Sequence, residues 1–226
     1  LPAHSLNSYV FDINLPDVCA PTCSSGKILK TKWLCDVFLQ TRAKNNLRHE
    51  IKINLLQASP PPGSAIEFKT SDHPGDVDLS LWLPSKNQNI KRAVKGEFRI
   101  KPLHDFSTSF IKIELTRHET TLSRQPAGQI YEVAHVLINQ SDVNYHGAEY
   151  NHSRSFILAE NVNFKNGELK IFPFEIPFEP DSPPTLNSSY GSIRWTIKGI
   201  VERGPTQRSF CSGEEELNVF STAPLD

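Results

Sequence analysis

Hydrophobic and polar residues alternate along most of this sequence, which is the pattern of half-buried strands. One such segment places Val77, Leu79, Leu81 and Leu83 on the same face. Further segments of this kind lie at residues 98–100, 111–115, 156–158, 169–174, 193–197 and 217–220. Because Pro, Gly and Asn separate them at intervals of about ten residues, the pattern predicts an all-β sandwich or barrel.

One apolar run is ambiguous. Residues 130–138 also match helical spacing, through Ile130, Val133, Ala134 and Leu137. Its β-branched content and the strands predicted on either side favour a strand.

Two distant segments share one order of landmarks, which indicates an internal repeat. Each contains a Phe-rich strand ending in Pro, a Pro-Thr pair, a Gly, a Trp and a closing strand. Phe174 follows Phe11 by 163 positions, Trp195 follows Trp33 by 162, and Leu217 follows Ile51 by 166. We therefore expect Phe11, Trp33, Phe174 and Trp195 to form the structural core of a repeated unit, with both Trp side chains facing inward.

The repeat predicts two sandwiches in tandem. Residues 71–226 are long enough for a complete sandwich, and residues 57–70, with three successive prolines, read as a stiff linker. Residues 1–56 supply about three strands, at 9–15, 28–39 and 50–56, which corresponds to the closing half of a first sandwich. Since Leu1 is not a translation start, we expect the opening half to come from sequence upstream of it, with an associated subunit as the other source. Without that half, Trp33, Phe38 and Leu39 would be exposed.

These motifs resemble the arrestin-like β-sandwich family. The matching residues run from Phe172 to Pro177, from Pro183 to Thr185, from Gly191 to Trp195 and from Glu216 to Val219. Upstream, residues 94–100 and 111–119 are similar to the early hairpin of that family. The arrestin-domain proteins, the retromer arrestin-like subunit and the bacterial sporulation-control proteins all share these features. The Pro-Pro-x-Tyr motif of the ubiquitin-ligase-recruiting arrestins does not occur, and the sequence gives no sign of the buried charged cluster of the receptor-binding arrestins.

Charge and composition exclude other classes. Lys and Arg number 24 against 25 Asp and Glu, which argues against a nucleic-acid binder with a broad basic face. No apolar run approaches the length of a membrane span. Cys19, Cys23, Cys35 and Cys211 do not form a dense disulfide framework, which favours reduced thiols in the cytosol. Three Asn-x-Ser sequons, at Asn139, Asn151 and Asn187, keep a secreted glycoprotein as an alternative.

Candidate chemistry is sparse. The cluster from His146 to His152 includes Glu149 and has zinc-like ligand types, but a polar loop is the simpler interpretation. Asp72, Asp76 and Asp78 lack the spacing of a calcium loop and indicate a solvated turn. No nucleophile elbow, phosphate loop or zinc-protease motif is present, and neighbours such as His118 and Glu119 would point to opposite faces of a strand.

The sequence therefore predicts a non-enzymatic adaptor without cofactor or metal. The resemblance implies a protein that binds other proteins, in a multi-subunit assembly of intracellular trafficking or signalling, in the cytoplasm. Lys91, Arg92 and Lys95 form a small basic cluster that could contact acidic lipid at an endomembrane surface or an acidic partner; guarding a sheet edge is the alternative. A secreted or cell-surface glycosylated binding domain is the competing class.

Overall fold

The computed structural model describes residues 10, 12–13, 20–39, 47–56, 60–61, 63–69, 72, 75–121, 147–188, 190–204 and 207–221. Phe11, Cys19, Asn139, His146 and the ambiguous run 130–138 lie outside these residues. All regular structure within them is β-strand. The strands are β1 (Trp33–Leu39), β2 (Leu47–Ile53), β3 (Ile66–Lys69), β4 (Val77–Leu83), β5 (Asn87–Asn89), β6 (Val94–Pro102), β7 (Phe106–Ser107), β8 (Phe110–Thr121), β9 (Glu149–Glu160), β10 (Asn163–Phe164), β11 (Lys170–Ile176), β12 (Leu186–Ser188), β13 (Gly191–Glu202), β14 (Phe210–Cys211) and β15 (Glu215–Phe220).

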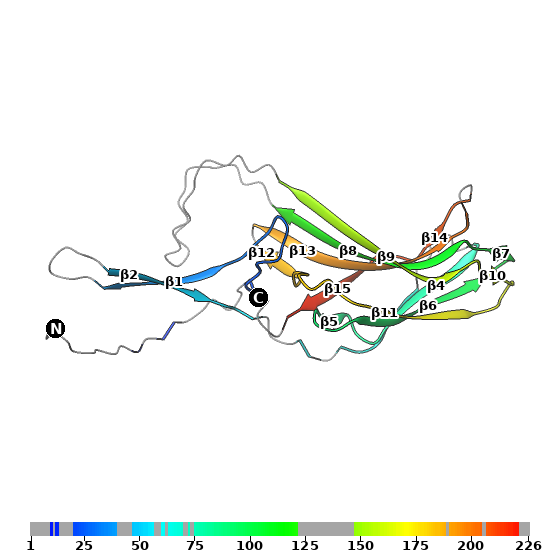
Figure 1. Ribbon diagram of the computed structural model, residues 1–226. Coiled ribbons are helices and arrows are strands. Elements are labelled where there is room, and N and C mark those ends of the chain that lie inside the picture. Colours follow the sequence, from blue (N-terminus) through cyan, green and yellow to red (C-terminus); the bar gives the residue numbers. More distant parts are fainter. Residues whose placement is uncertain are drawn as a thin grey trace.

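Residues from β3 onward form a sandwich of two main sheets (Figure 1). One sheet has the strand order β11-β6-β4-β3, and the other has the order β5-β15-β13-β8-β9, with β12 and β14 also paired to β13. A two-stranded sheet of β7 and β10 closes one end. The all-β, sandwich-type fold predicted from the alternation is therefore confirmed.

The alternation along each strand determines which side chains fill the space between the sheets. In β4, Val77, Leu79, Leu81 and Leu83 are buried while Asp78 is exposed. β-Branched and aromatic residues suit such half-buried positions, because their side chains pack against neighbours on a pleated surface. One continuous core results, to which both sheets contribute.

The two sheets are in close contact at Gly199 of β13. A Cβ atom built there would lie 2.3 Å from Cε2 of Phe98 on β6, in the opposing sheet. The Phe98 ring, which is completely buried, therefore occupies the space that any other residue at position 199 would need.

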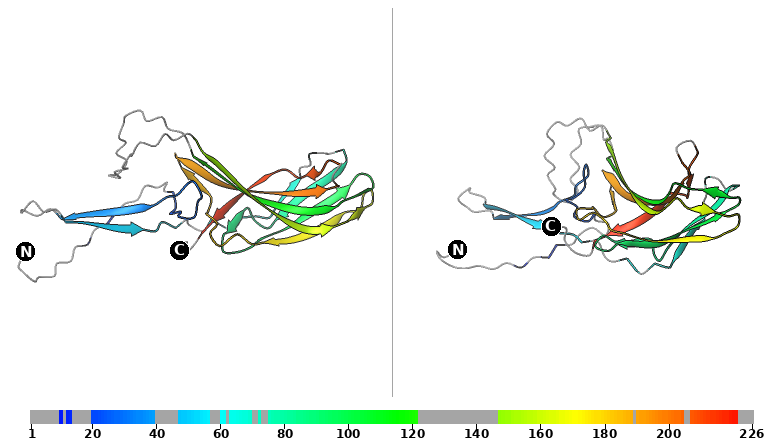
Figure 2. Two further views of the ribbon diagram at one scale, coloured as in Figure 1. Left: turned by 45° about the horizontal axis from the view of Figure 1, so that its top comes forward. Right: turned by 45° about the vertical axis from the view of Figure 1, so that its right-hand side comes forward.

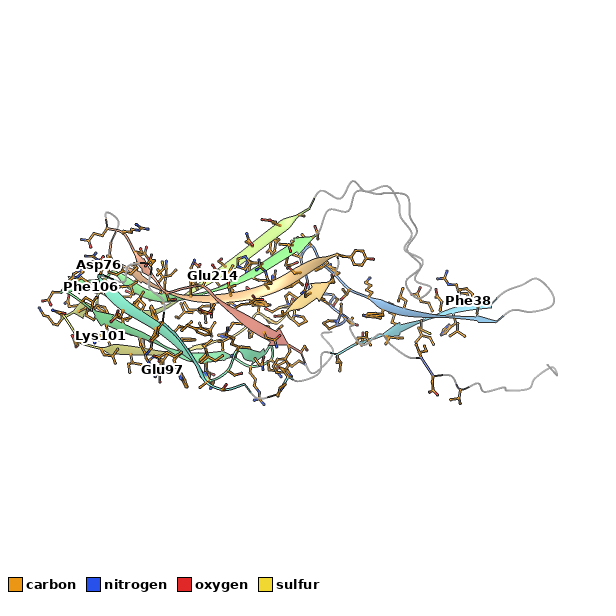
Figure 3. The ribbon with its side chains drawn as sticks, turned by 180° about the vertical axis from the view of Figure 1, so that it is seen from behind. Phe38, Asp76, Glu97, Lys101, Phe106 and Glu214 are labelled. Atoms are coloured by element: carbon orange, nitrogen blue, oxygen red, sulfur yellow. The ribbon has the colours of Figure 1, made fainter. Side chains whose placement is uncertain are left out.

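β1 and β2 form a separate antiparallel hairpin that projects from the end of the sandwich carrying β12 (Figures 1 and 2). The strand expected at 28–39 begins only at Trp33, and the strand expected at 50–56 spans Leu47–Ile53. In Figure 3, Phe38 on this hairpin and Phe106 lie toward opposite ends of the molecule.

The hairpin repeats the local structure of the β13–β15 pair. Trp33 is opposite Ile53, as Trp195 is opposite Leu217. The indole N–H of Trp33 donates to the carbonyl of Ala20 at 2.8 Å, and that of Trp195 donates to the carbonyl of Pro183 at 2.9 Å. Each acceptor directly precedes a Pro-Thr pair in the sequence.

The threonine of each Pro-Thr pair holds the closing strand in the same way. Thr22 N–H donates to the carbonyl of Leu55, and Leu55 N–H donates back to the Thr22 hydroxyl at 2.8 Å. Thr185 and Val219 make the same two bonds, the second at 2.9 Å. The two Thr hydroxyls also donate to the carbonyls of Ile53 and Leu217, respectively. We call residues 20–55 and 183–219 the first and second closing modules.

These bonds correct two equivalences drawn from sequence. Ile53, and not Ile51, corresponds to Leu217, so the offset there is 164 and not 166. The Gly-x-Ile pattern shared by residues 26–28 and 191–193 pairs Ile28 with Ile193. In the structure it is Thr31, which bridges to Cys23, that corresponds to Ile193, which bridges to Leu186. The first module has additional residues between Gly26 and Trp33, and these residues make a contact described below.

The linker expected at residues 57–70 is partly strand. Ile66 to Lys69 form β3, which pairs with β4 and is an edge of the four-stranded sheet. Ile66 and Phe68 are half-buried while Glu67 and Lys69 are exposed, and Phe68 packs against the core.

Candidate functional site

Near the end of β8, the structure buries a carboxylate, that of Glu119. The Glu119 residue has no exposed surface. Its Oε1 accepts the backbone N–H of Lys27 at 3.0 Å, and its Oε2 accepts those of Ile28 at 2.9 Å and Leu29 at 3.4 Å. Successive backbone amides that converge on one oxygen pair form an anion-binding arrangement. The additional residues of the first module thus hold a side chain of the sandwich.

Arg117 supplies the opposite charge. Its Nε lies 3.0 Å from Oε1 of Glu119, and both side chains are almost fully buried. The guanidinium also lies 5.4 Å from the ring centre of Tyr150 and 5.9 Å from that of Trp195. A buried carboxylate is tolerated only when its charge is paired and its oxygens are hydrogen-bonded, and both conditions hold for Glu119.

An apolar contact accompanies this charged one. Cys23 and Leu29 of the first module pack against Leu186 and Ile193 of the second, and Ala20 adds to the cluster. The first module is therefore fixed to the sandwich by one buried carboxylate and a small apolar cluster. Burial raises the pKa of the Cys23 thiol, which marks this cysteine as a packed thiol and not a reactive one.

His118 lies on the other face of β8. Its Nδ1 is 2.8 Å from Oδ1 of Asn151, and its Nε2 is 3.0 Å from the Thr196 hydroxyl and 3.1 Å from Oε1 of Glu214. The Thr196 hydroxyl, followed by His118, lowers the pKa of Glu214. The two neighbours His118 and Glu119 thus point to opposite faces, as alternation predicts, and they do not form a relay.

Sequence reasoning missed Arg117 and Glu119 as a pair. The available indication was that both residues continue the inward-facing row of Ile111, Ile113 and Leu115, where charged residues are out of place. This alternation could not identify the groups that bind Glu119, because the backbone amides of residues 27–29 are about 90 positions away in the sequence.

The residues predicted as the core of the repeat have different surroundings. Trp195 is buried and packs edge-on against Phe178 at 5.2 Å, and Phe174 is buried in β11. Trp33 makes the equivalent hydrogen bond but is only half-buried. Phe11 lies outside the described residues.

The predicted basic cluster lies beside the turn that joins β5 to β6. The backbone amides of Lys91 and Arg92 bond to Asn89, and both residues are exposed. Lys95 is exposed on β6 and pairs with Glu175 of β11 at 3.1 Å.

The candidate metal ligands are engaged with other groups. His152 Nε2 is 3.2 Å from Glu179, Asp76 is 3.8 Å from His104, and Asp72 accepts the amide of Cys211. Within the described residues, no three His, Cys, Asp or Glu side chains gather as a metal ion would need. Cys23, Cys35 and Cys211 are not joined by a disulfide.

The fold and these contacts define an immunoglobulin-like β-sandwich that carries a repeated closing module. The sequence family described as "Arrestin (or S-antigen), N-terminal domain" matches residues 85–222, which is more than half of the chain. The chain therefore belongs to the arrestin family. The arrestin-like fold predicted from the motifs is confirmed. The match runs from β5 to β15 and so includes the second closing module, whereas β3 and β4 lie before it.

Among solved structures, the chain is similar to Spo0M, a sporulation control protein from Bacillus subtilis. The two share 12% sequence identity with a TM-score of 0.47 over 65% of this chain. The aligned part spans 50% of Spo0M. No protein with a curated description matches the sequence. The described residues contain no helix with the length and hydropathy to cross a membrane.

Proposed function

We propose that this chain is a non-enzymatic scaffold or adaptor that binds other proteins in intracellular trafficking or signalling. Membership of the arrestin family supports this, because arrestin-type sandwiches are generally non-enzymatic and generally interact with other proteins. The location we propose is the cytoplasm, with at most peripheral contact to an endomembrane.

The observation that carries the proposal is the outer edge of β9. This strand has 12 residues and pairs with β8 along one edge only. No strand in the described part of the chain pairs with its other edge. An exposed edge of this length offers backbone N–H and C=O groups to an extended peptide, which is a common mode of adaptor binding.

The direction of the backbone groups in β9 identifies those available to a partner. Thr121 N–H donates to the carbonyl of Ala148, so the backbone N–H and C=O groups of Thr121, Glu119, Arg117 and Leu115 point toward β9. In β9, the residues opposite the last three are Tyr150, His152 and Arg154, and their backbone groups point toward β8. The amides of Asn151, Ser153 and Ser155 are therefore directed outward.

A proline at Ser155 tests the edge directly. Ser155→Pro removes one outward amide, whereas Ser155→Ala keeps it and removes only the hydroxyl. Proteins that cross-link to the wild-type chain in cytosol should also cross-link to Ser155→Ala, but not to Ser155→Pro. Unchanged near-ultraviolet circular dichroism should show that both variants remain folded. Equal capture by all three would contradict binding at this edge.

The secreted alternative has its own test. Asn151 lies in β9 with its side chain bonded to His118, and Asn187 lies in β12. A mass shift of the native protein on glycosidase treatment would exclude the cytoplasmic location.

Lys91, Arg92 and Lys95 remain a proposed contact for acidic lipid. Sedimentation with vesicles of acidic lipid, compared between the wild type and a variant in which all three residues are replaced by Gln, would test this contact.

A further inference from the structure

In the described part of the sandwich, β9 and β11 leave unpaired strand edges on the same side. β9 is the last strand of the large sheet and β11 is the first strand of the small one, and the two strands lie in contact. The guanidinium of Arg154 on β9 donates to the carbonyl of Pro177, the residue after β11, at 3.2 Å. A peptide that approaches this side of the sandwich therefore meets both edges.

A proline blocks the edge of β11. Leu103 N–H donates to the carbonyl of Asp76, so alternate residues of β6 counted back from Leu103 direct their backbone groups to β4. Phe98 lies between these residues and is directed to β11, where it is opposite Phe172. The backbone nitrogen of Pro173 therefore faces the unpaired edge and has no N–H to donate, which is a common way for an edge strand to avoid pairing. β9 contains no proline, so all of its outward amides are present.

The C-terminal half of β9 is apolar on both faces. On the outer face, Ile157 is 56% exposed, and Phe110, at the adjoining end of β8, is 36% exposed. On the inner face, Phe156 and Leu158 pack against the core but are only half-buried. A strand paired with this half would therefore bury apolar side chains on both of its own faces.

The charges along β9 are complementary to a basic partner. Glu149 and Glu160, at the two ends of the strand, are exposed, and neither forms an ion pair with another described residue. Arg154 is already paired with Glu179 at 3.5 Å, and Glu179 also lies 3.2 Å from His152. The charge that remains unpaired along the edge is therefore negative, at both of its ends.

We propose that the outer edge of β9 binds an extended segment of another protein that is apolar where it crosses residues 156–158 and carries Lys or Arg beside Glu149 and Glu160. This rests on the proposed function, since it specifies the partner of the same edge. The segment matches the 12 residues of β9 in length. It runs antiparallel to β9, in keeping with the pairing of β9 to β8 and of β8 to β13.

Charge also argues against a second copy of this chain as the occupant. Antiparallel pairing of β9 with β9 over its full length would place Glu149 of each copy beside Glu160 of the other. Like charges would then meet at both ends of the joined strands, which destabilises cross-strand pairs. A basic segment turns the same two positions into attractive pairs.

Fluorescence anisotropy with two labelled peptides of 12 residues, the length of β9, tests the proposal. The first peptide has Lys at both ends, Val at the three positions that face residues 156–158, and Thr or Ser elsewhere. The second differs only in having Glu at both ends. We expect the Lys peptide to bind about tenfold more tightly at low salt, and the difference to shrink at about 0.5 M salt because exposed charges are screened. Equal affinities, or tighter binding of the Glu peptide, would overturn the proposal.

Variants of the two carboxylates identify the origin of the preference. Glu149→Gln and Glu160→Gln should each weaken binding of the Lys peptide about two- to fivefold, because exposed ion pairs contribute little. The double variant should no longer prefer the Lys peptide. Glu216→Gln is the matched control, because Glu216 is exposed on β15 of the same sheet, separated from β9 by β13 and β8, and its loss should leave binding unchanged. A preference for the Lys peptide that persists in the double variant would refute the proposed partner.

Ser155→Pro distinguishes a wrong partner from a wrong edge. If Ser155→Pro abolishes capture of proteins from cytosol but the peptides bind regardless of their end charges, the edge binds a partner of other chemistry and only the basic segment is refuted. If Ser155→Pro changes neither capture nor peptide binding, the edge is not the binding site and both proposals fail. Dimerisation of the chain that Ser155→Pro abolishes would identify a second copy as the occupant and would also overturn the basic segment.

Discussion

The carboxylate of Glu119 accepts the backbone amide of Ile28 at 2.9 Å, although 91 positions separate the two residues. This bond joins the first closing module to the sandwich. Because the carboxylate is completely buried beside Arg117, the contact depends on its charge as well as on its shape.

Substitution of Glu119 should therefore destabilise the chain strongly. Glu119→Ala leaves the charge of Arg117 buried without its carboxylate partner, and we expect a loss of about 3–5 kcal/mol in the free energy of unfolding. Glu119→Gln keeps acceptor capacity without charge and should cost less. The amides of residues 27–29 should lose their protection in hydrogen exchange in Glu119→Ala and keep part of it in Glu119→Gln, which retains one acceptor oxygen.

Glu114→Gln is the matched control for this prediction. Glu114 lies on the same strand but on the outer face, where it pairs with Lys198 at 2.9 Å. Its loss should cost no more than about 1 kcal/mol in urea unfolding, because surface ion pairs contribute little. An equal cost for the Glu114 and Glu119 variants would contradict a special role for the buried carboxylate.

The two equivalent threonines offer a second test. Thr185→Val removes the hydroxyl that bonds to Leu217 and Val219, inside the sandwich, and should lower its free energy of unfolding by about 1–2 kcal/mol. Thr22→Val removes the same bonds from the first module. We expect Thr22→Val to speed hydrogen exchange of the Leu55 amide and to leave the free energy of unfolding of the sandwich unchanged. A decrease in that free energy as large as the one for Thr185→Val would show that the two modules unfold together.

The contact between Gly199 and Phe98 predicts an intolerant glycine. Gly199→Ala places a methyl group against the Phe98 ring in a packed core, and we expect a loss of about 1–3 kcal/mol. Gly75 serves as the control, because nothing lies within 4 Å of a Cβ atom built there. Thermal unfolding should place Gly199→Ala well below Gly75→Ala, which should stay close to wild type.

Acid should weaken the outer face of the large sheet. The Thr196 hydroxyl and His118 lower the pKa of Glu214 below its ordinary value of 4.5. A depressed carboxyl pKa stabilises the folded state fully above the unfolded value, and the contribution is lost as the pH falls through the folded value. The difference in unfolding free energy between wild type and Glu214→Gln should thus be largest above the ordinary value of 4.5 and should shrink as the pH falls below it.

Thr196→Val provides the companion measurement. Without the hydroxyl, the pKa of Glu214 should move back toward 4.5, which carboxyl NMR titration can follow directly. A titration midpoint of Glu214 that is the same in wild type and Thr196→Val would contradict this origin of the shift.

Much of the sandwich was predictable from sequence because burial alternates along most of its long strands. β4, β8 and β13 all lie where the apolar residues recur at every second position. Shorter strands such as β5 and β12 have three residues each, too few for a period to emerge. β3 was assigned to the linker because the prolines before it dominated the local pattern, whereas pairing with β4 decided its structure.

The repeat was recognisable from its Trp and Pro-Thr landmarks, but its register was not. Sequence similarity favoured Ile51 as the equivalent of Leu217, since a Glu precedes both residues. The hydrogen bonds of Thr22 instead select Ile53 and Leu55. Such a two-residue shift keeps every side chain on the same face, so hydrophobic alternation cannot detect it.

The hydrogen bonds that the Glu119 carboxylate accepts from Lys27 and Ile28 have an evolutionary consequence. They involve backbone N–H groups, which every residue except proline would carry at positions 27 and 28. The side chain of Lys27 is exposed and that of Ile28 is half-buried. Substitutions at these two positions should therefore be tolerated, except for substitution by proline. The Glu119 side chain has no such freedom, so we expect Glu119 to be conserved among homologous chains while the residues at positions 27 and 28 vary.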